Sequence, residues 1–215
     1  SSTTFPQKKS TPQAIKQALQ QYKAEDTDWK RGRVWALAYW LDDETYQLAQ
    51  DAYCMYFSEN GLNPAVFPSL RRMEQEVVSM SADLLNGDDE VCGNMTSGGT
   101  ESILLAVFTA KQAYMAKHPD FQGEPEAVVP ITAHPAFEKA FHYFGVKPIH
   151  ITQDENFRVK VDEAAAAIND RTCMIIGSAP SYPMGTMDDI QSLGQLALQH
   201  NIPLHVDACI GGFIL

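Results

Sequence analysis

A run of small and hydroxylated residues, Thr96-Ser97-Gly98-Gly99-Thr100, stands directly before a segment with helical character. Small residues let the backbone approach an anion, and hydroxyls donate hydrogen bonds to it. The start of a helix adds free N–H groups and a favourable dipole. The run therefore indicates a phosphate cradle, and an ordinary loop with Thr100 as helix N-cap is the alternative that the motif alone leaves open.

Two further side chains follow segments that are predicted to be strands. His134 comes just after residues 127–132, where an imidazole could stack on a flat ring, although a lone histidine is more often structural. Tyr182 lies in a Pro-rich turn, residues 177–183, that leaves the predicted strand 172–178. A site role for Tyr182 and a purely packing role both stay open.

A carboxylate ends the apolar segment Leu204-His205-Val206-Asp207. An ionised Asp at the end of a buried strand is costly unless it meets a cation, and a protonated pyridine nitrogen is one such cation. Asp207 is therefore the best single candidate for a site residue. The alternatives are a cap on the following turn or a pair with an arginine.

Alternating strands and helices must position these residues. The pattern predicts strands at 127–132, 146–152, 172–178 and 203–207, and helices that begin near Thr100, run from Pro135 to Gly145, are capped by Asp162, and span 188–200. This order indicates an α/β fold with a mainly parallel sheet and helices on both faces. Ligands of such sheets bind beyond the carboxyl ends of the strands, where the candidates lie.

The first third of the chain reads as helical. Helices are predicted at 12–23, 43–58 and 69–85, with a turn at 60–64. The apolar face of the third helix is predicted to pack in the core; its residues are Leu70, Met73, Val77, Met80 and Leu84. We expect an N-terminal helical segment with an active-site loop at 1–65 and a large domain at 66–215, incomplete at its C-terminus.

Composition narrows the class of protein. The 215 residues are 45% hydrophobic and 20% charged, with a formal net charge of −11, which argues against broad nucleic-acid or anionic-membrane binding. No apolar run reaches the roughly 18–20 residues of a membrane span, and the first ten residues lack a signal sequence. The four cysteines are widely spaced, so we expect no disulfide framework and no metal site, and a soluble, cytoplasmic protein. An upstream anchor or export signal would lie outside these residues.

The chain resembles the fold-type I pyridoxal-5′-phosphate (PLP) enzymes of the group II decarboxylase family. Three features carry the resemblance, in this order: the small-residue run 96–100, which we call the anion loop, then His134, and then His205-Val206-Asp207-Ala208. Within that family the sequence motifs are similar to those of the sphingosine-1-phosphate lyases. The resemblance extends from about Arg33 to Leu215, and the passages that carry it are residues 95–104, 133–140, 177–180 and 203–213.

The resemblance implies a role for each matching residue. Gly99 and Thr100 would hold the cofactor phosphate, and His134 would stack on the pyridine ring. Asp207 would pair with the ring nitrogen, and Ala208 would pack beside it. Tyr182, Asp207 and His134 would then form the catalytic group.

The resemblance also implies substrate contacts, some of them across the interface of a homodimer. Tyr39, Asn60 and Tyr182 would line the substrate pocket. Asn63 stands where the lyases usually have a histidine associated with the phosphate end of the substrate. An amide donates hydrogen bonds but carries no charge, so phosphate affinity or substrate identity would differ at this position.

The Schiff-base lysine of the family follows the His-Val-Asp-Ala sequence by some tens of residues. Here only residues 208–215 follow Asp207, and none is a lysine. We therefore expect that lysine, and a small C-terminal domain, in residues beyond this sequence.

The resemblance implies a PLP-dependent carbon–carbon lyase. It would cleave sphingosine-1-phosphate or a related phosphorylated sphingoid base in a retro-aldol sense to a fatty aldehyde and phosphoethanolamine. A PLP-dependent amino-acid decarboxylase and a non-catalytic, lysine-less fragment are the alternatives. The turn at 177–180 and Cys209 favour the lyase.

Overall fold

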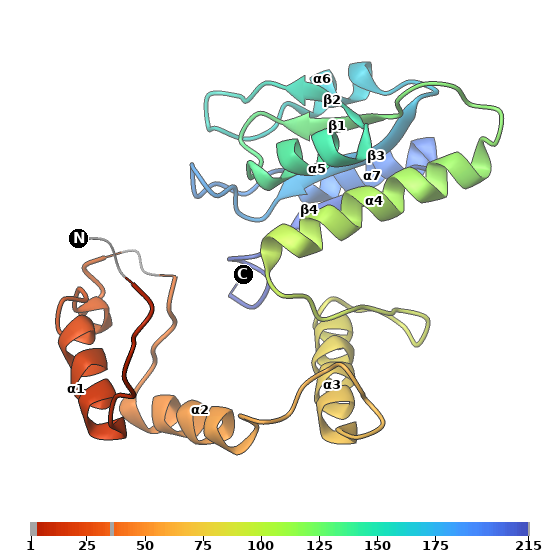
Figure 1. Cartoon of the computed structure of the whole chain (residues 1–215). Helices are drawn as coiled ribbons and strands as arrows, with labels where there is room; N and C mark the ends of the chain where they lie inside the picture. The colour runs from red at the N-terminus through yellow and green to blue at the C-terminus, as the bar shows by residue number, and fades with distance from the viewer. Residues whose placement is uncertain (1–3, 35–36, 215) are drawn as a thin grey trace. The chain divides into compact units, whose positions relative to one another are not determined.

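The computed structural model describes residues 4–34 and 37–214 (Figure 1). The chain divides into two compact units, Ser1–Val77 and Val78–Leu215. This division falls inside a helix, α3 (Pro68–Leu84), so it is a division of contacts, and the predicted domain boundary after residue 65 remains a prediction. The two units are described separately.

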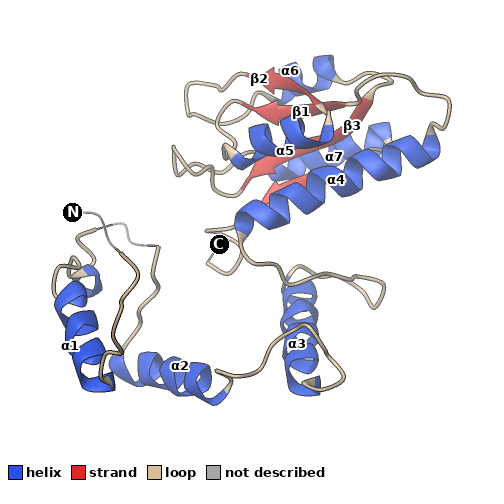
Figure 2. Ribbon diagram, viewed as in Figure 1, coloured by secondary structure: helices blue, strands red, loops and turns tan. Residues whose placement is uncertain are grey.

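A four-stranded parallel sheet forms the centre of the second unit, as Figure 2 shows. Its strands are β1 (Glu126–Pro130), β2 (Lys147–Ile151), β3 (Thr172–Ser178) and β4 (Leu204–Asp207), arranged in the order β2-β1-β3-β4. Every residue of β1 and β3 is buried, as expected for central strands that are covered on both faces. The predicted α/β fold with a parallel sheet is confirmed.

Helices cover both faces of this sheet. On one face lie α4 (Gly99–Lys117) and α5 (Ala136–Phe144), and on the other lie α6 (Val161–Ala167) and α7 (Ile190–His200). Successive residues of a strand point to opposite faces, so neighbouring valines of β1 enter different cores. Val129 packs toward α4 and α5, and Val128 packs toward α6 and α7.

Two predicted helix starts need correction. α7 begins at Ile190 with Asp189 as its N-cap, whose side chain accepts from the Ser192 N–H, so Asp188 is not helical. The N-cap of α6 is Lys160, and Asp162 lies within the first turn. The start of α6 is fixed by a long-range contact instead, because Glu163 accepts hydrogen bonds from the backbone N–H and the hydroxyl of Thr152.

The first unit is helical. It contains α1 (Pro12–Lys23), whose bounds match the prediction, then the short 3₁₀-helix η1 (Trp29–Arg31), α2 (Asp43–Met55) and the first part of α3. The prediction that the apolar face of α3 packs in the core is wrong. No side chain of α3 is buried, and Met80 is 62% exposed. An apolar face at helical spacing is buried only where another element covers it, and the spacing alone does not reveal a cover.

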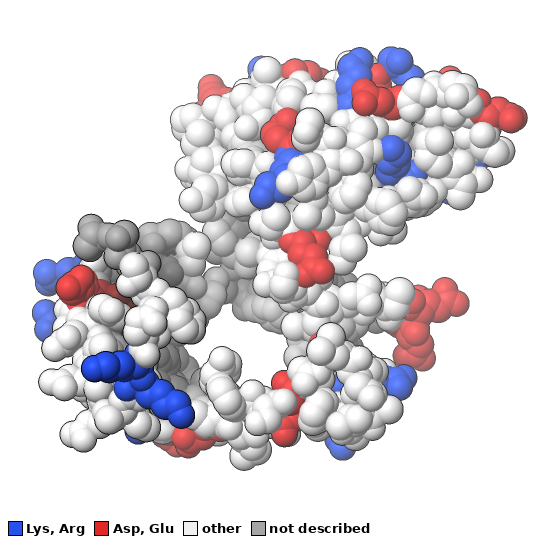
Figure 3. Space-filling view, in the orientation of Figure 1, with Lys and Arg blue, Asp and Glu red and all other residues white. Residues whose placement is uncertain are grey.

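The charged side chains on the surface form small groups of mixed sign (Figure 3). In the view of Figure 3, acidic and basic side chains form small groups of both signs, and most of the visible surface carries neither. Together with the net charge of −11, this means that an anionic ligand has to be held by local donors. Among the helices of residues 4–34 and 37–214, none combines the length and hydropathy needed to cross a bilayer.

Candidate active site

The loop before α4 opens into a helix N-terminus with free donors. Gly98 is the N-cap with φ 155°, a backbone conformation that favours glycine, and a Cβ built on it would meet nothing within 4 Å. Within the part of the chain that the structure describes, the N–H groups of Gly99, Thr100 and Glu101 have no acceptor. Open space in front of unpaired N–H groups at the start of a long helix suits an anion.

Two donors of this loop, both on Ser97, are already engaged. The Glu101 carboxylate accepts from both the N–H and the hydroxyl of Ser97, each at 2.6 Å. The side-chain hydrogen bond from Ser97, followed by the backbone one, lowers the pKa of Glu101, so this carboxylate is ionised at neutral pH. The donors left for a ligand are therefore those of Gly99, Thr100 and the Glu101 N–H.

Asp207 ends β4 with one carboxylate oxygen engaged. Its Oδ1 accepts from the Cys209 N–H at 3.1 Å, whereas Oδ2 has no hydrogen-bond partner among the described residues. Asp207 is half-buried, and its backbone carbonyl accepts from the Ala179 N–H at 2.8 Å. The side chain shares a face of the sheet with His205, whose ring meets the ring of Phe137 edge-on at 5.6 Å.

The anion loop and the end of β4 lie next to each other. A Cβ built on Gly99 would stand 3.6 Å from the Cys209 Sγ, two residues beyond Asp207. Ala208 lies between Asp207 and Cys209 in the sequence. Its carbonyl accepts a hydrogen bond from the Gly212 N–H, which folds the chain back after β4. The structure thus brings Gly99 and Thr100 to the same edge of the sheet as Asp207 and Ala208.

His134 and Tyr182 form a second group at this edge. Their rings meet in a T-shaped contact with centroids 5.5 Å apart. The Ala136 N–H donates to His134 Nδ1 at 3.1 Å, which orients the imidazole and leaves Nε2 as the protonated nitrogen of the neutral ring. Tyr182 is 54% exposed, so it is not packed in a core.

Two buried hydroxyls after β1 and β3 lack partners. Thr132 Oγ1 and Ser181 Oγ are buried and make no hydrogen bond within the described ranges. Thr132 stands between β1 and His134, and Ser181 precedes Tyr182. Both hydroxyls thus lie beyond strand ends with hydrogen-bonding capacity that the described residues do not use.

The three remaining predicted residues belong to the first unit. Tyr39 lies in an irregular stretch and is 73% exposed. Asn60 and Asn63 are exposed, and their side-chain carbonyls accept from the N–H groups of Leu62 and Ala65, respectively. The amide NH₂ of Asn63 has no acceptor among the described residues, so it is available as a donor.

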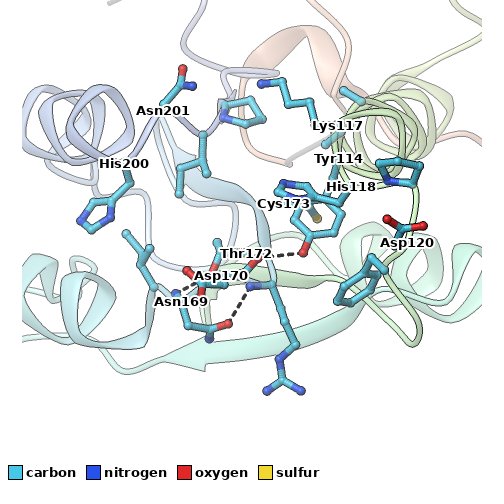
Figure 4. A pocket seen from close by; sticks show the side chains of 18 residues that line it. Tyr114, Lys117, His118, Asp120, Asn169, Asp170, Thr172, Cys173, His200 and Asn201 are labelled. Carbon is cyan, nitrogen blue, oxygen red and sulfur yellow. Dashed lines mark hydrogen bonds between the residues drawn. The ribbon is translucent and has the colours of Figure 1, made fainter.

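A cleft of about 1060 Å³ lies at the opposite edge of the sheet (Figure 4). It is formed by the ends of α4 and α7 and by the start of β3, with Tyr114 and His200 on its two sides and Cys173 in its wall. The Tyr114 hydroxyl donates to the Asp170 carbonyl at 2.7 Å. None of the predicted site residues lines this cleft, so volume and predicted chemistry point to different edges. Ligands of parallel sheets bind at the carboxyl ends of the strands, so the candidate site lies at that edge.

Comparison with known proteins shows the family of the chain. Residues 2–215 match the family model described as the pyridoxal-dependent decarboxylase conserved domain. The chain belongs to the pyridoxal-dependent decarboxylase family. The family match confirms the prediction that the cofactor is pyridoxal phosphate.

Individual members of this family give the same result. The chain is 44% identical over 191 residues to the sphingosine-1-phosphate lyase of Saccharomyces cerevisiae, which covers 88% of this chain and 32% of that protein. The solved structure of a sphingosine-1-phosphate lyase from Burkholderia pseudomallei K96243 superposes with a TM-score of 0.90 at 34% identity, covering 99% of this chain and 50% of that chain. A probable L-aspartate decarboxylase of Pyrococcus furiosus is 33% identical over 211 residues, covering 98% of this chain and 54% of that protein.

These matches confirm the predicted resemblance to sphingosine-1-phosphate lyases and the fold-type I architecture. The chain spans about a third of the length of the curated lyase that it matches.

The carboxyl edge fits pyridoxal phosphate in this member of the family. The start of α4 offers unpaired N–H groups and open space at Gly98 for a phosphate. On the same edge, the free Oδ2 of Asp207 can accept from a protonated ring nitrogen. Donors for the cofactor phosphate and an acceptor for the protonated ring nitrogen are thus both present, and neither has a partner among the described residues.

Sequence reasoning missed several polar residues of this edge. Thr132 and Ser181 carried a usable signal, since each is a hydroxyl just beyond a predicted strand. Asp188 was interpreted as the start of a helix, yet it is 3% exposed and bonded to two backbone N–H groups. Nothing local in the sequence separates this buried Asp from the exposed Asp189 that follows it.

Proposed function

We propose that the whole protein is a PLP-dependent carbon–carbon lyase that acts on phosphorylated sphingoid bases such as sphingosine-1-phosphate. The proposal rests on one observation. The free N–H groups at the start of α4 and the free carboxylate oxygen of Asp207 lie at the same edge of the sheet. The similarity to lyases from a yeast and from a bacterium supports this substrate class over others in the family.

The cofactor contacts follow from the free groups. Gly99 and Thr100 would hold the phosphate through their backbone N–H groups, with the Thr100 hydroxyl as a further donor. His134 would stack on the ring, in the orientation that the Ala136 N–H gives it. Ala208 would leave room beside the ring because its side chain is a single methyl group.

Pyridoxal phosphate, when bound, draws electrons away from the carbon that bears the substrate amine, which is the chemistry that this cleavage requires. Asp207 would hold the proton on the ring nitrogen, because a carboxylate favours a neighbouring cation. The Tyr182 hydroxyl would exchange a proton with the 3-hydroxyl of the substrate, next to the His134 ring that it contacts.

Substrate contacts are proposed for the first unit. Tyr39 and Asn60 would line the substrate pocket, and the free amide NH₂ of Asn63 would donate to the substrate phosphate. Enzymes of this fold build their sites between subunits, so we propose a homodimer by analogy.

An amino-acid decarboxylase is the second candidate, and it rests on the 33% identity to a probable L-aspartate decarboxylase. Both candidates use the same cofactor contacts, so only the products separate them.

The deciding experiment uses the purified full-length protein with added PLP. Incubation with sphingosine-1-phosphate should release a fatty aldehyde and phosphoethanolamine, and incubation with aspartate or glutamate should release no carbon dioxide. Carbon dioxide without aldehyde would replace the lyase by a decarboxylase. A protein that shows neither product and no PLP absorbance band would overturn both proposals.

A further inference from the structure

The loop that carries Tyr182 is closed at its base. It leaves β3 after Ser178 and returns at Asp188, whose N–H donates to the Ser178 carbonyl at 3.0 Å. Inside the loop, the Ser181 N–H donates to the Thr186 carbonyl and the Gly185 N–H donates to the Ser181 carbonyl. Tyr182 therefore stands on a short, internally bonded excursion, which we call the 178–188 loop.

The Asp188 carboxylate holds this loop to a second segment. Its Oδ2 accepts from the Ser178 N–H at 2.9 Å, and its Oδ1 accepts from the Val159 N–H at 2.8 Å. The side chain is 3% exposed, and no cation contacts it among the described residues. Burial raises the pKa of Asp188, and the two backbone N–H groups oppose that rise. A buried carboxylate that meets only backbone N–H groups has a bridging role rather than an ion-pairing one.

The segment on the other side of the bridge is itself well ordered by hydrogen bonds. Residues 153–159, which we call the 153–159 turn, are closed by a bridge between Gln153 and Val159. Asp154 Oδ1 accepts from the N–H groups of Asn156 and Arg158 at 2.8 and 2.9 Å. The turn thus offers a fixed point against which a loop can be held.

A second hydrogen bond joins the same two segments. The Thr186 hydroxyl donates to the Phe157 carbonyl at 3.0 Å. The 178–188 loop is therefore attached to the 153–159 turn at two points, through Asp188 at its base and through Thr186 two residues before it. Two attachments fix an orientation, whereas one would leave a hinge.

We propose that Asp188 is a positioning residue for the active site, because it braces the 178–188 loop against the 153–159 turn and so holds the Tyr182 ring against His134. The role of the brace in catalysis rests on the proposed function, but the brace itself does not. Asp188 acts through Tyr182 and touches no reacting atom.

The test compares Asp188→Asn with Asp189→Asn in the full-length protein. Asparagine at 188 keeps the size of the side chain but has one acceptor oxygen in place of two, and its NH₂ must face a backbone N–H. Asparagine at 189 remains a good N-cap for α7, so this neighbouring, exposed position is the matched control.

Amide hydrogen exchange is the readout that does not depend on activity. In Asp188→Asn, exchange should rise roughly tenfold in the peptides that cover the 178–188 loop and the 153–159 turn, because one hydrogen bond of the bridge is lost. It should stay unchanged in Asp189→Asn. Equal exchange in the two variants would overturn the brace.

Kinetics test whether Asp188 acts through Tyr182. Asp188→Asn should lower kcat with little change in KM, and the double variant with Tyr182→Phe should be no slower than Tyr182→Phe alone. Additive losses would assign Asp188 to general stability instead. A wild-type protein without lyase activity would overturn the proposed function and leave hydrogen exchange as the test of the brace.

A third variant guards against misfolding. If Asp188→Asn does not fold, Thr186→Val removes only the second attachment at a half-exposed position. Exchange should then rise in the same two segments and nowhere else, and an unchanged pattern would count against the brace.

Discussion

The two edges of the parallel sheet use their polar groups in opposite ways. At the amino edge, the buried Glu126 carboxylate receives hydrogen bonds or ion pairs from Asn169, Lys147 and Arg171. At the carboxyl edge, the donors at the start of α4, one oxygen of Asp207 and two buried hydroxyls are left without partners among the described residues. Satisfied groups stabilise a fold, whereas the unpaired donors at the start of α4 and the second oxygen of Asp207 remain available to a ligand.

The same difference separates the cleft of Figure 4 from the candidate site. The cleft between α4 and α7 is roomy, but its edge has met much of its hydrogen-bonding need from within the chain. The carboxyl edge retains the groups that a charged cofactor needs. Each of the following predictions would sharpen or break this contrast.

The largest effect is expected for Asp207→Asn in the full-length enzyme. The amide keeps the shape but not the charge, so PLP binding should remain measurable while kcat falls by about 10³-fold. Asp170→Asn is the matched control at the amino edge, where the side chain is exposed, and it should leave kcat unchanged. Steady-state kinetics and cofactor absorbance give the answer, and normal turnover in Asp207→Asn would remove its assigned role.

Tyr182→Phe should have the next largest effect. Loss of the hydroxyl that is proposed to exchange a proton should slow cleavage by about 10²-fold, while the PLP absorbance stays the same. The T-shaped ring contact with His134 needs no hydroxyl, so the loop should keep its position. Unchanged kinetics would make Tyr182 a packed aromatic only.

Glu126→Gln should affect stability and not the site. The variant replaces a 1% exposed carboxylate that serves three donors, so the free energy of unfolding should fall by about 1–3 kcal/mol, measured with urea at pH 7. PLP affinity should be unchanged, because Glu126 lies at the other edge. A parallel loss of affinity would show that the two edges are coupled.

The same substitution should change the acid response. The hydrogen bond from Asn169, helped by Lys147 and Arg171 and opposed by burial, holds the pKa of Glu126 below its usual 4.5. The stability that this provides is present above pH 4.5 and is lost as the pH falls through the lower folded-state pKa. Glu126→Gln should therefore lose less stability than wild type between pH 4.5 and pH 3.

His205→Phe should give a smaller pH effect. Burial lowers the pKa of His205 below 6.5, against the opposing charge of Asp207, so wild-type stability falls as the pH drops from 6.5 through the folded-state pKa. Phenylalanine can keep the edge contact with Phe137 but cannot titrate. Urea midpoints at pH 7.5 and 5.5 should differ less in the variant than in wild type or in the exposed control His200→Gln.

The smallest effect concerns labelling rates. Cys209 is exposed and lies beside Gly99, so PLP should slow its alkylation, while the exposed Cys92 should react at the same rate with and without cofactor. Burial raises the pKa of Cys173, in the wall of the cleft, to about 12, so this thiol should stay unlabelled. Protection of Cys92 in place of Cys209 would move the cofactor away from this edge.

Local sequence patterns predicted the bounds of helices and strands better than the tertiary contacts that these segments make. The bounds of β3 and α1 match the prediction because apolar runs and helical spacing are properties of neighbouring residues. The exposure of the α3 face and the burial of Asp188 could not be predicted, since each depends on which distant segment packs there.

The candidate site shows the same limit. The rule that ligands bind past the carboxyl ends of strands predicts the edge and the candidates Asp207 and His134, whose roles stay predictions. The contact between His134 and Tyr182, the free hydroxyls of Thr132 and Ser181, and the brace at Asp188 required the tertiary structure.

The strand order also has a consequence for how the chain folds. β1 pairs with β2 through the short connection that holds α5, whereas its pairing with β3 closes a longer loop, and β4 can pair only after β3 is in place. Longer loops cost more entropy to close, about 0.6 kcal/mol for each doubling. We expect β1 and β2 to gain protection first in pulse-labelled refolding and β4 last. Of these four strands, β4 would therefore place Asp207 last, so the groups that would hold the cofactor come together only after β1, β2 and β3 have paired.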